Sequence, residues 1–285
     1  MKNLCIFLLS IVLFVSGQTI THAVDTSNPK PTILLHGLNG GSDTYKVMKK
    51  SYEDINYAVG EVLVNKNGGI KTTKVAKVTK TIIHGPGNED GRGVVTPLVV
   101  SVVFENNKDS IANQAKWVKK VLTEVKKTYR TNKVDIIAHS MGGLTATKYI
   151  LDTGGNDIDT LITLDSPILG SKLPSFLNAL KIVNRDLRVA IKSAQETFPS
   201  LVDLQINSKA IQDLYKRRSK FNKNIKVISW AATKNDFKII NTVSTGSAHG
   251  LQHFTKNIKL FVMDTNHSGI HDLPADPLLA YSRGN

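Results

Sequence analysis

The sequence has little cysteine. Its one cysteine among 285 residues is Cys5, which lies in an N-terminal segment that we expect to be removed from the mature protein. We therefore predict that the mature chain has no disulfide and no cysteine-based metal site. A chain of this length can bury a core large enough to fold without such crosslinks.

Long hydrophobic runs are lacking as well. The N-terminal apolar segment, Leu4 to Val15, has about 12 residues, far fewer than the ~20 that a membrane-spanning helix requires. Lys2 precedes it and the small-residue pattern Thr21-His22-Ala23 follows it, as in a secretory signal peptide. We interpret residues 1–23 as a signal peptide and predict that residues 24–285 are secreted or associated with the cell surface. A membrane anchor is the alternative.

Acidic and aromatic residues are also few. The chain has 23 Asp and Glu against 37 Lys and Arg, a formal net charge of +14, and only 6% aromatic residues. A basic chain can associate with nucleic acid or with an anionic wall or membrane surface. Because no nucleic-acid motif accompanies the charge, we predict no nucleic-acid partner. A charge that serves only solubility is the simpler interpretation, and loose association with anionic polymers of the cell envelope is the alternative. The composition indicates no oligomeric state.

Short apolar runs alternate with helical patterns along the rest of the chain. Residues Ile111 to Tyr129 show the clearest helical pattern, since apolar side chains recur there at helical spacing while most lysines fall off that stripe. Strands that alternate with helices predict an α/β fold with a mostly parallel central sheet flanked by helices. The expected strands are 32–35, 61–64, 72–83, 98–104, 134–138, 160–164, 225–231 and 258–263, and the other expected helices are 42–57 and 141–151.

Residues 168–224 interrupt this alternation with helical, polar sequence. One apolar stripe at helical spacing lies within them: Leu173, Phe176, Leu177, Leu180 and Val183. We predict that this segment is a helical cap insertion over the functional site, where its apolar stripe would favour an acyl or other apolar group. Two ordinary packing helices with a long connection are the alternative.

The clearest functional signal is Ser140, in the run Ala-His-Ser-Met-Gly-Gly. A serine hydroxyl is a weak nucleophile unless a base and a favourable geometry activate it. A sharp strand-to-helix turn presents the serine in that way, and it requires small residues two positions either side, usually as G-x-S-x-G. Here these positions are Ala138 and Gly142, between an expected strand and an expected helix. We predict that Ser140 is a nucleophile, and a structural turn serine is the alternative.

Two backbone N–H groups are needed to stabilise the oxyanion that forms when such a serine attacks a carbonyl. One comes from the residue after the serine, here Met141, whose helix also points its positive end at the developing charge. The other comes from the loop after an early strand, for which His36-Gly37-Leu38-Asn39-Gly40-Gly41 is suited. We predict Met141 and Leu38 as the two donors, and a plain tight turn is the alternative for the loop.

The acid and the histidine of such a site follow the serine in that order along the chain. His267 lies just past the last expected strand and is the predicted base, with His271 as its competitor. Asp236 follows the strand 225–231 after a short loop and is the predicted acid. Asp165, at the end of the preceding strand, is the alternative acid.

We do not expect the other downstream histidines to form a metal site. His249 and His253 are spaced as on one face of a helix, but no third ligand is evident. We expect surface or capping roles for them and predict no metal. Acyl transfer through a serine needs no cofactor either.

Four motifs carry a family resemblance: H-G-L-N-G-G at the first strand, V-V-F-E-N-N before the long helix, A-H-S-M-G-G-L at the turn and N-H-S-G-I near the end. They resemble motifs of the small bacterial lipases and esterases of the α/β-hydrolase superfamily, and in particular of the cell-surface hydrolases of Gram-positive bacteria. The resemblance covers most of residues 31–275 and implies the α/β-hydrolase fold. Bacillus lipases also carry alanine at the position of Ala138. The family pattern supports His267 over His271.

By the same resemblance, Ser140 carries over as nucleophile, Asp236 as acid, and Leu38 and Met141 as oxyanion donors. Relatives commonly have glycine after the acid, whereas Phe237 follows it here. The predicted function is a serine hydrolase that cleaves small-molecule or lipid carboxylic esters through an acyl-enzyme intermediate. An amidase or peptidase acting on cell-wall components is one alternative, and a catalytically silent wall-binding protein of the same fold is another.

Overall fold

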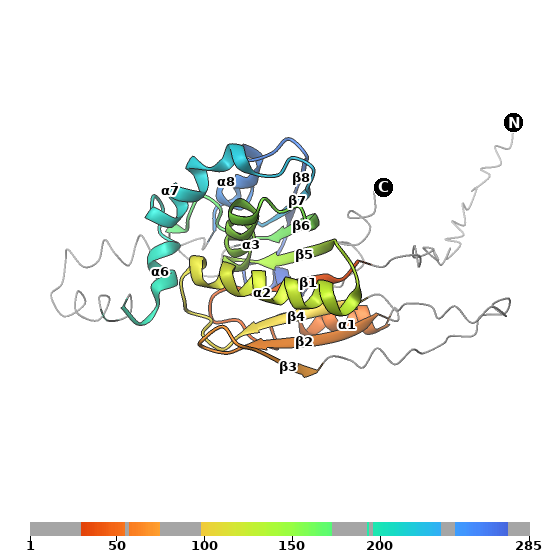
Figure 1. The fold of residues 1–285 in the computed structure, drawn as a ribbon. Helices are drawn as coiled ribbons and strands as arrows, with labels where there is room; N and C mark the ends of the chain where they lie inside the picture. Colours follow the sequence, from red (N-terminus) through yellow and green to blue (C-terminus); the bar gives the residue numbers. More distant parts are fainter. Residues whose placement is uncertain are drawn as a thin grey trace, which may run out of the picture.

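One eight-stranded sheet organises the chain (Figure 1). The computed structural model describes residues 30–54, 57–74, 98–172, 193, 196–234 and 243–272. The strand order is β3-β2-β4-β1-β5-β6-β7-β8, and neighbouring strands are parallel except for β2 and β3. The mostly parallel sheet that the sequence predicts is therefore confirmed. The strands are β1 (Thr32–Leu35), β2 (Ala58–Val64), β3 (Ile70–Lys74), β4 (Leu98–Phe104), β5 (Val134–His139), β6 (Ile158–Leu164), β7 (Lys226–Ala232) and β8 (Ile258–Met263).

The central strands are buried on both faces. Every residue of β1 is buried, and β1 pairs with β5 from Thr32↔Asp135 to Leu35↔Ala138. Continuous apolar runs are typical of parallel strands that helices cover on both sides. Because these strands are parallel, the residues that follow β1, β5 and β6 lie together at one edge of the sheet.

The strands at the β3 edge of the sheet begin at other residues than the sequence predicts. β2 starts at Ala58, earlier than expected, because that residue already pairs with Leu98 of β4. The chain turns back through Asn65, whose Oδ1 accepts a hydrogen bond from the N–H of Gly69 at 2.7 Å. The expected continuation of the next strand, residues 75–83, lies outside the described residues.

Helices cover both faces of the sheet. α2 (Ile111–Tyr129) and α3 (Met141–Thr153) lie side by side on one face, and α1 (Lys46–Asp54) covers the other (Figure 1). The sheet separates two apolar cores: one contains the buried sides of α2 and α3, and the other contains that of α1. The predicted α/β architecture is confirmed in this respect as well.

Local capping sets the ends of the two long helices. The Ser110 side chain accepts a hydrogen bond from the N–H of Asn113 at the start of α2. Gly154 caps the end of α3 and adopts the left-handed conformation (φ 83°) that glycine tolerates. α3 begins directly after Ser140 without a side-chain cap, which leaves its positive N-terminal end at the site.

Residues 168–224 are described only in part. Phe176 and Leu180, with the rest of the apolar stripe, lie outside the described residues. The buried side of α7 joins the core beside α3, so this portion belongs to the main helical layer. The cap stays a prediction for the remainder. The described helices of this region are α6 (Pro199–Asp203), α7 (Lys209–Lys216) and η1 (Arg218–Lys220).

Short helical turns complete the C-terminal part. They are α8 (Thr245–Ala248), η2 (Gly250–His253) and η3 (Ile270–Asp272). Within the described ranges, none of the helices has the length and apolar character needed to cross a membrane.

Candidate active site

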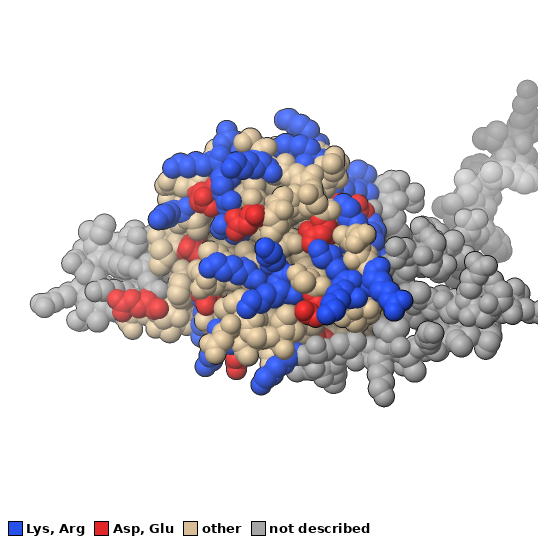
Figure 2. Space-filling model, in the orientation of Figure 1, with Lys and Arg blue, Asp and Glu red and all other residues tan. Residues whose placement is uncertain are grey.

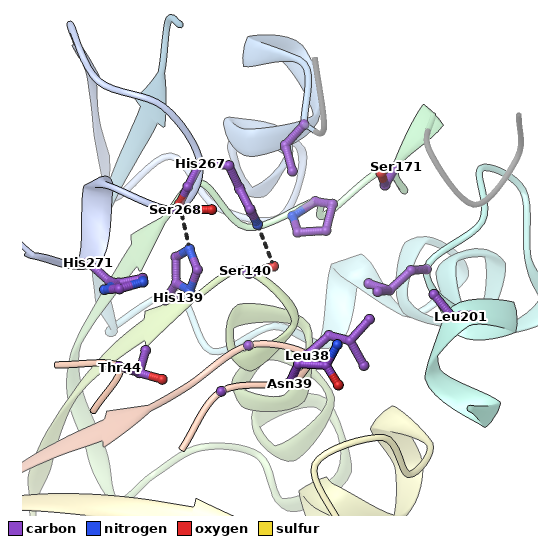
Figure 3. Close-up of a pocket in the computed structure, with 15 residues that line it drawn as sticks. Leu38, Asn39, Thr44, His139, Ser140, Ser171, Leu201, His267, Ser268 and His271 are labelled. Carbon is purple, nitrogen blue, oxygen red and sulfur yellow. Dashed lines mark hydrogen bonds between the residues drawn. The ribbon is translucent and has the colours of Figure 1, made fainter. Parts of the chain in front are cut away.

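Ser140 occupies the strand-to-helix turn that the sequence predicts, between β5 and α3 (Figure 3). Its backbone lies at φ 52° and ψ −126°, a conformation that costs a non-glycine residue free energy and recurs at functional sites. Two hydrogen bonds hold this conformation: Ser140 N–H donates to Leu164 O, and Gly143 N–H donates to Ser140 O, each at 3.0 Å. The turn therefore fixes the hydroxyl at the carboxyl edge of the sheet.

Close backbone contacts explain the small residues around Ser140. A Cβ on Gly142 would lie 2.4 Å from Leu35 O, so a larger residue would push α3 away from β1. A Cβ on Gly37 would lie 2.7 Å from Ser140 Cβ. Ala138 keeps its own Cβ fully buried, and the turn thus accommodates alanine where glycine is commoner.

His267, in the loop after β8, contacts the serine. Its Nε2 lies 2.9 Å from Ser140 Oγ. His271 is placed differently: its Nδ1 lies 3.2 Å from Asp272 Oδ1, and its ring packs edge-on against His139. The structure thus brings the predicted base, rather than its competitor, to the serine.

Asp165 lies at the other ring nitrogen of His267. Its Oδ2 is 2.7 Å from His267 Nδ1, and its Oδ1 accepts a hydrogen bond from Ala232 N–H at 3.0 Å. Asp165 directly follows β6, the neighbour of β5, so it reaches the histidine beside Ser140. Asp165, the alternative acid, is therefore the carboxylate that contacts the histidine. Asp236, the predicted acid, lies outside the described residues.

These three side chains define where the protons lie. The Asp165 carboxylate can only accept, so His267 donates from Nδ1. When the ring is neutral, its Nε2 is an acceptor, to which the Ser140 hydroxyl can donate. In this arrangement the imidazole can take the hydroxyl proton while the carboxylate stabilises the imidazolium that forms.

His36 holds the glycine-rich loop that follows β1. Its Nε2 accepts a hydrogen bond from Phe104 N–H at 3.1 Å, and its Nδ1–H donates to Gly37 O at 2.8 Å. Burial lowers the pKa of His36, which agrees with this neutral form. A Cβ on Gly40 would lie 2.7 Å from His36 Cβ, and Asn107 Nδ2 donates to Gly40 O at 2.8 Å. The loop is therefore fixed where it meets the serine.

The two predicted oxyanion donors belong to segments that meet at Ser140. Leu38 follows Gly37, which lies so close to Ser140 that a Cβ would not fit between them. Leu38 also lines the pocket that contains Ser140. Met141 is the first residue of α3. Their role as donors stays a prediction.

A pocket of about 330 Å³ opens over Ser140 (Figure 3). Pockets that combine an apolar lining with a few polar groups are typical of small-molecule sites. The apolar lining consists of Leu38, Pro167, Leu201, Leu204 and Val243. The polar lining, besides the serine and histidines, includes Asn39, Thr44, Ser171 and Ser268.

His139 is a pocket residue that was not anticipated from the sequence. Its Nε2 lies 2.8 Å from the backbone O of His267. Its ring centroid is 4.8 Å from that of His267 and 4.7 Å from that of His271. Burial, and then the neighbouring His267 and His271, lower the pKa of His139 well below its usual value. The one feature of the sequence that could have pointed to His139 is its position directly before Ser140.

The remaining downstream histidines are engaged elsewhere. His249 Nε2–H donates to Phe261 O at 2.9 Å, and the His253 ring packs against Tyr215. In the part of the chain that the structure describes, no group of three or more His, Cys, Asp or Glu is arranged to hold a metal ion.

The mostly parallel sheet, the strained turn at Ser140 and its hydrogen-bonded partners define the chain as an α/β hydrolase. The family model described as "Alpha/beta hydrolase of unknown function (DUF915)" matches residues 19–275. The chain belongs to this family, and the resemblance to α/β hydrolases is thereby confirmed. A comparison with curated proteins gave no match.

Solved structures share this fold. A gene product of Listeria innocua has a TM-score of 0.60 at 18% identity, covering 89% of this chain and 93% of its own. A protein described as a cell surface hydrolase from Lactobacillus plantarum has a TM-score of 0.57 at 20% identity, covering 89% of each chain. A lipase of Bacillus licheniformis in its mature form has a TM-score of 0.57 at 12% identity, covering 90% of this chain and 92% of its own.

Proposed function

We propose that this protein is a secreted serine hydrolase that cleaves carboxylic esters, with Ser140 as nucleophile, His267 as base and Asp165 as acid. The observation that carries the proposal is the pair of hydrogen bonds made by His267, 2.9 Å to Ser140 Oγ and 2.7 Å to Asp165 Oδ2. We assign the acid to Asp165 rather than to Asp236 because the Asp165 carboxylate lies at Nδ1, the second ring nitrogen of His267. The hydrogen bond from Ala232 N–H fixes the orientation of this carboxylate.

The proposed reaction has two steps. In the first, Ser140 Oγ bonds to the ester carbonyl carbon while its proton moves to His267 Nε2. The carbon–oxygen bond to the alcohol then breaks, and the proton on Nε2 moves to the leaving oxygen. In the second step, water gives a proton to Nε2 and its oxygen bonds to the carbonyl carbon of the acyl-enzyme. The bond from that carbon to Ser140 Oγ then breaks, Oγ takes the proton back from Nε2, and the carboxylic acid product is released.

The oxyanion of each step needs fixed donors. We propose the backbone N–H groups of Leu38 and Met141 for this role. Support comes from the close approach of Gly37 to Ser140 and from the uncapped start of α3. Such donors are effective because they need no reorganisation when the charge develops.

An ester with an apolar group fits the pocket best. The leucines that line it favour an apolar portion of the substrate, and hydrolysis at Ser140 requires no metal. The Bacillus licheniformis structure of the same fold is described as a lipase, which points in the same direction. The segment 1–23 and the surface location given for the Lactobacillus plantarum protein support secretion.

The test is hydrolysis of a p-nitrophenyl ester series by the wild type and by Ser140→Ala. We expect the wild type to cleave short and medium esters and Ser140→Ala to lose about 10⁴–10⁶-fold in kcat. Activity that survives in Ser140→Ala would contradict the role of the serine. Release of amines from wall peptides, with no cleavage of esters, would favour an amidase instead.

A further inference from the structure

The loop that carries His267 has to reach across the edge of the sheet. β8 is the last strand, and β6 and β7 separate it from β5, which leads to Ser140. Neighbouring strands lie about 4.8 Å apart, so the loop extends roughly 14 Å from its own strand. Asp165 orients the ring of His267. Lys234 N–H donates to Thr265 O at 2.9 Å near the start of the loop, but this bond comes from beyond β7 and does not reach β5.

His139 provides a direct connection to the backbone of this loop. Its Nε2 lies 2.8 Å from His267 O (Figure 3), and because a carbonyl oxygen only accepts, Nε2–H is the donor. His139 is the last residue of β5, so the bond ties the loop to the strand end that carries the serine. A hydrogen bond within the loop, such as Gly269 N–H to Asn266 Oδ1 at 2.7 Å, makes no such connection.

The surroundings of His139 keep it in this orientation. The residue is only 7% exposed, and its ring contacts those of His267 and His271. Tyr45 in turn packs against His271, with 6.2 Å between the ring centroids. This burial and these ring contacts leave the imidazole little space in which to turn. A buried neutral imidazole has one N–H, and the bond to His267 O assigns it to Nε2.

We propose that His139 is a positioning residue, whose hydrogen bond to His267 O holds the base within reach of Ser140 Oγ. The proposal rests on the proposed function, since it assigns His139 an action through the base rather than on the substrate. A misplacement of about 1 Å in a reacting group can cost roughly 100-fold in rate. Loss of this bond therefore affects the chemical step more than substrate binding.

The test compares His139→Gln with His139→Met. The two side chains have the same length, but only Gln carries an N–H near the place of Nε2. The probe is a fluorophosphonate, because its reaction with the serine needs the base but no particular ester. We expect His139→Met to lower the labelling rate of Ser140, and kcat on p-nitrophenyl butyrate, by about 10–100-fold with little change in KM. We expect His139→Gln to stay within about threefold of the wild type.

His249 offers a matched control. Its Nε2–H also donates to a backbone carbonyl, that of Phe261 on β8, at 2.9 Å and away from the pocket. His249→Met removes the same kind of hydrogen bond, and we expect it to keep the wild-type labelling rate even if its melting temperature falls.

Two results would overturn the proposal: His139→Met labelled as fast as the wild type, or His139→Gln as slow as His139→Met. If His139→Met does not fold, His139→Asn replaces it, because its shorter amide does not reach His267 O. The same difference from His139→Gln is then expected. A wild type that fails to label at Ser140 contradicts the proposed function itself, and this inference with it.

Discussion

Asp165 fixes His267 in the tautomer that can accept the serine proton, because its carboxylate takes the hydrogen bond from Nδ1. In Asp165→Asn this acceptor is lost and the wrong tautomer is favoured. We expect kcat on p-nitrophenyl esters to fall by about 10⁴-fold with little change in KM. Asp264→Asn is the control, since this carboxylate is 81% exposed and pairs with Lys234 outside the pocket. If Asp165→Asn kept the wild-type kcat, Asp165 would not be the acid and Asp236 would be favoured instead.

Two buried histidines make stability depend on pH. Burial lowers the pKa of His36 and His139 below the ordinary value of 6.5, so the unfolded chain takes up protons at a higher pH than the folded protein. Their contribution is present above about pH 6.5 and is lost as the pH falls, at up to ~1.4 kcal/mol per pH unit for each histidine. Urea unfolding at pH 7 and pH 5 measures this loss. His139→Gln is expected to lose less stability than the wild type, and an equal loss would contradict a neutral His139.

The sequence indicates some of these residues and not others. Ser140 lies in a local motif, and His267 lies in the loop after the last strand, so both could be placed from the chain alone. Asp165 and Asp236 both follow strands in the required order, so the sequence does not separate them, and Asp165 is favoured by its contact with His267 in the fold. The hydrogen bond of His139 joins residues far apart in the chain, which no local pattern reveals.

Among the elements, α6 places an apolar side chain beside the pocket. Ser200 Oγ donates to Lys108 O at 2.9 Å, and Asp203 Oδ2 accepts a hydrogen bond from Ile111 N–H at 2.8 Å. These bonds join α6 to the beginning of α2 (Figure 1). Leu201 is thereby held at the pocket.

Leu201 and Val202 allow a matched test of this wall. Leu201 lines the pocket, whereas Val202 is 43% exposed on the same helix. We expect Leu201→Ala to change the ratio of kcat/KM between octanoate and acetate esters by about tenfold, because the size of the apolar group that fits is altered. Val202→Ala is expected to leave the ratio unchanged. Equal ratios in both variants and the wild type would show that α6 does not contact the substrate.

The elements themselves could be predicted where their pattern is strong. The central strands are continuous apolar runs, and α2 has a clear helical period, so their positions agree with expectation. The start of β2 is set by its pairing with β4, and α6 is held by bonds from α2. Such tertiary contacts leave no periodic signal in the sequence.

Basic residues spread over the face that carries α2 and α3, with fewer acidic residues between them (Figure 2). On α2 and at its end, Lys116, Lys119, Lys127 and Arg130 are exposed, whereas Lys126 pairs with Asp157 at 2.5 Å. An exposed basic face attracts anionic polymers, and salt screens that attraction over about 10 Å at 0.1 M. We propose that this face contributes to loose association with the cell envelope.

Neutralising this face tests that association. We expect Lys116→Gln/Lys119→Gln/Lys127→Gln to bind purified anionic wall polymer less tightly than the wild type at low salt, with kcat unchanged and the difference lost at high salt. The matched control is the triple Lys→Arg variant, which keeps the charge and is expected to bind as the wild type does. If the Gln variant and the wild type bound equally, this basic face would not contribute to the association, and its charge would serve solubility alone.

The proposed role of Ser140 is that of the activated nucleophile of this α/β hydrolase. Its most direct test is reaction of the wild-type protein with a fluorophosphonate, followed by mass spectrometry of the peptides. We expect a single adduct on the peptide that contains Ser140, and no adduct in Ser140→Ala. A folded wild type without an adduct, or an adduct on another residue, would contradict it.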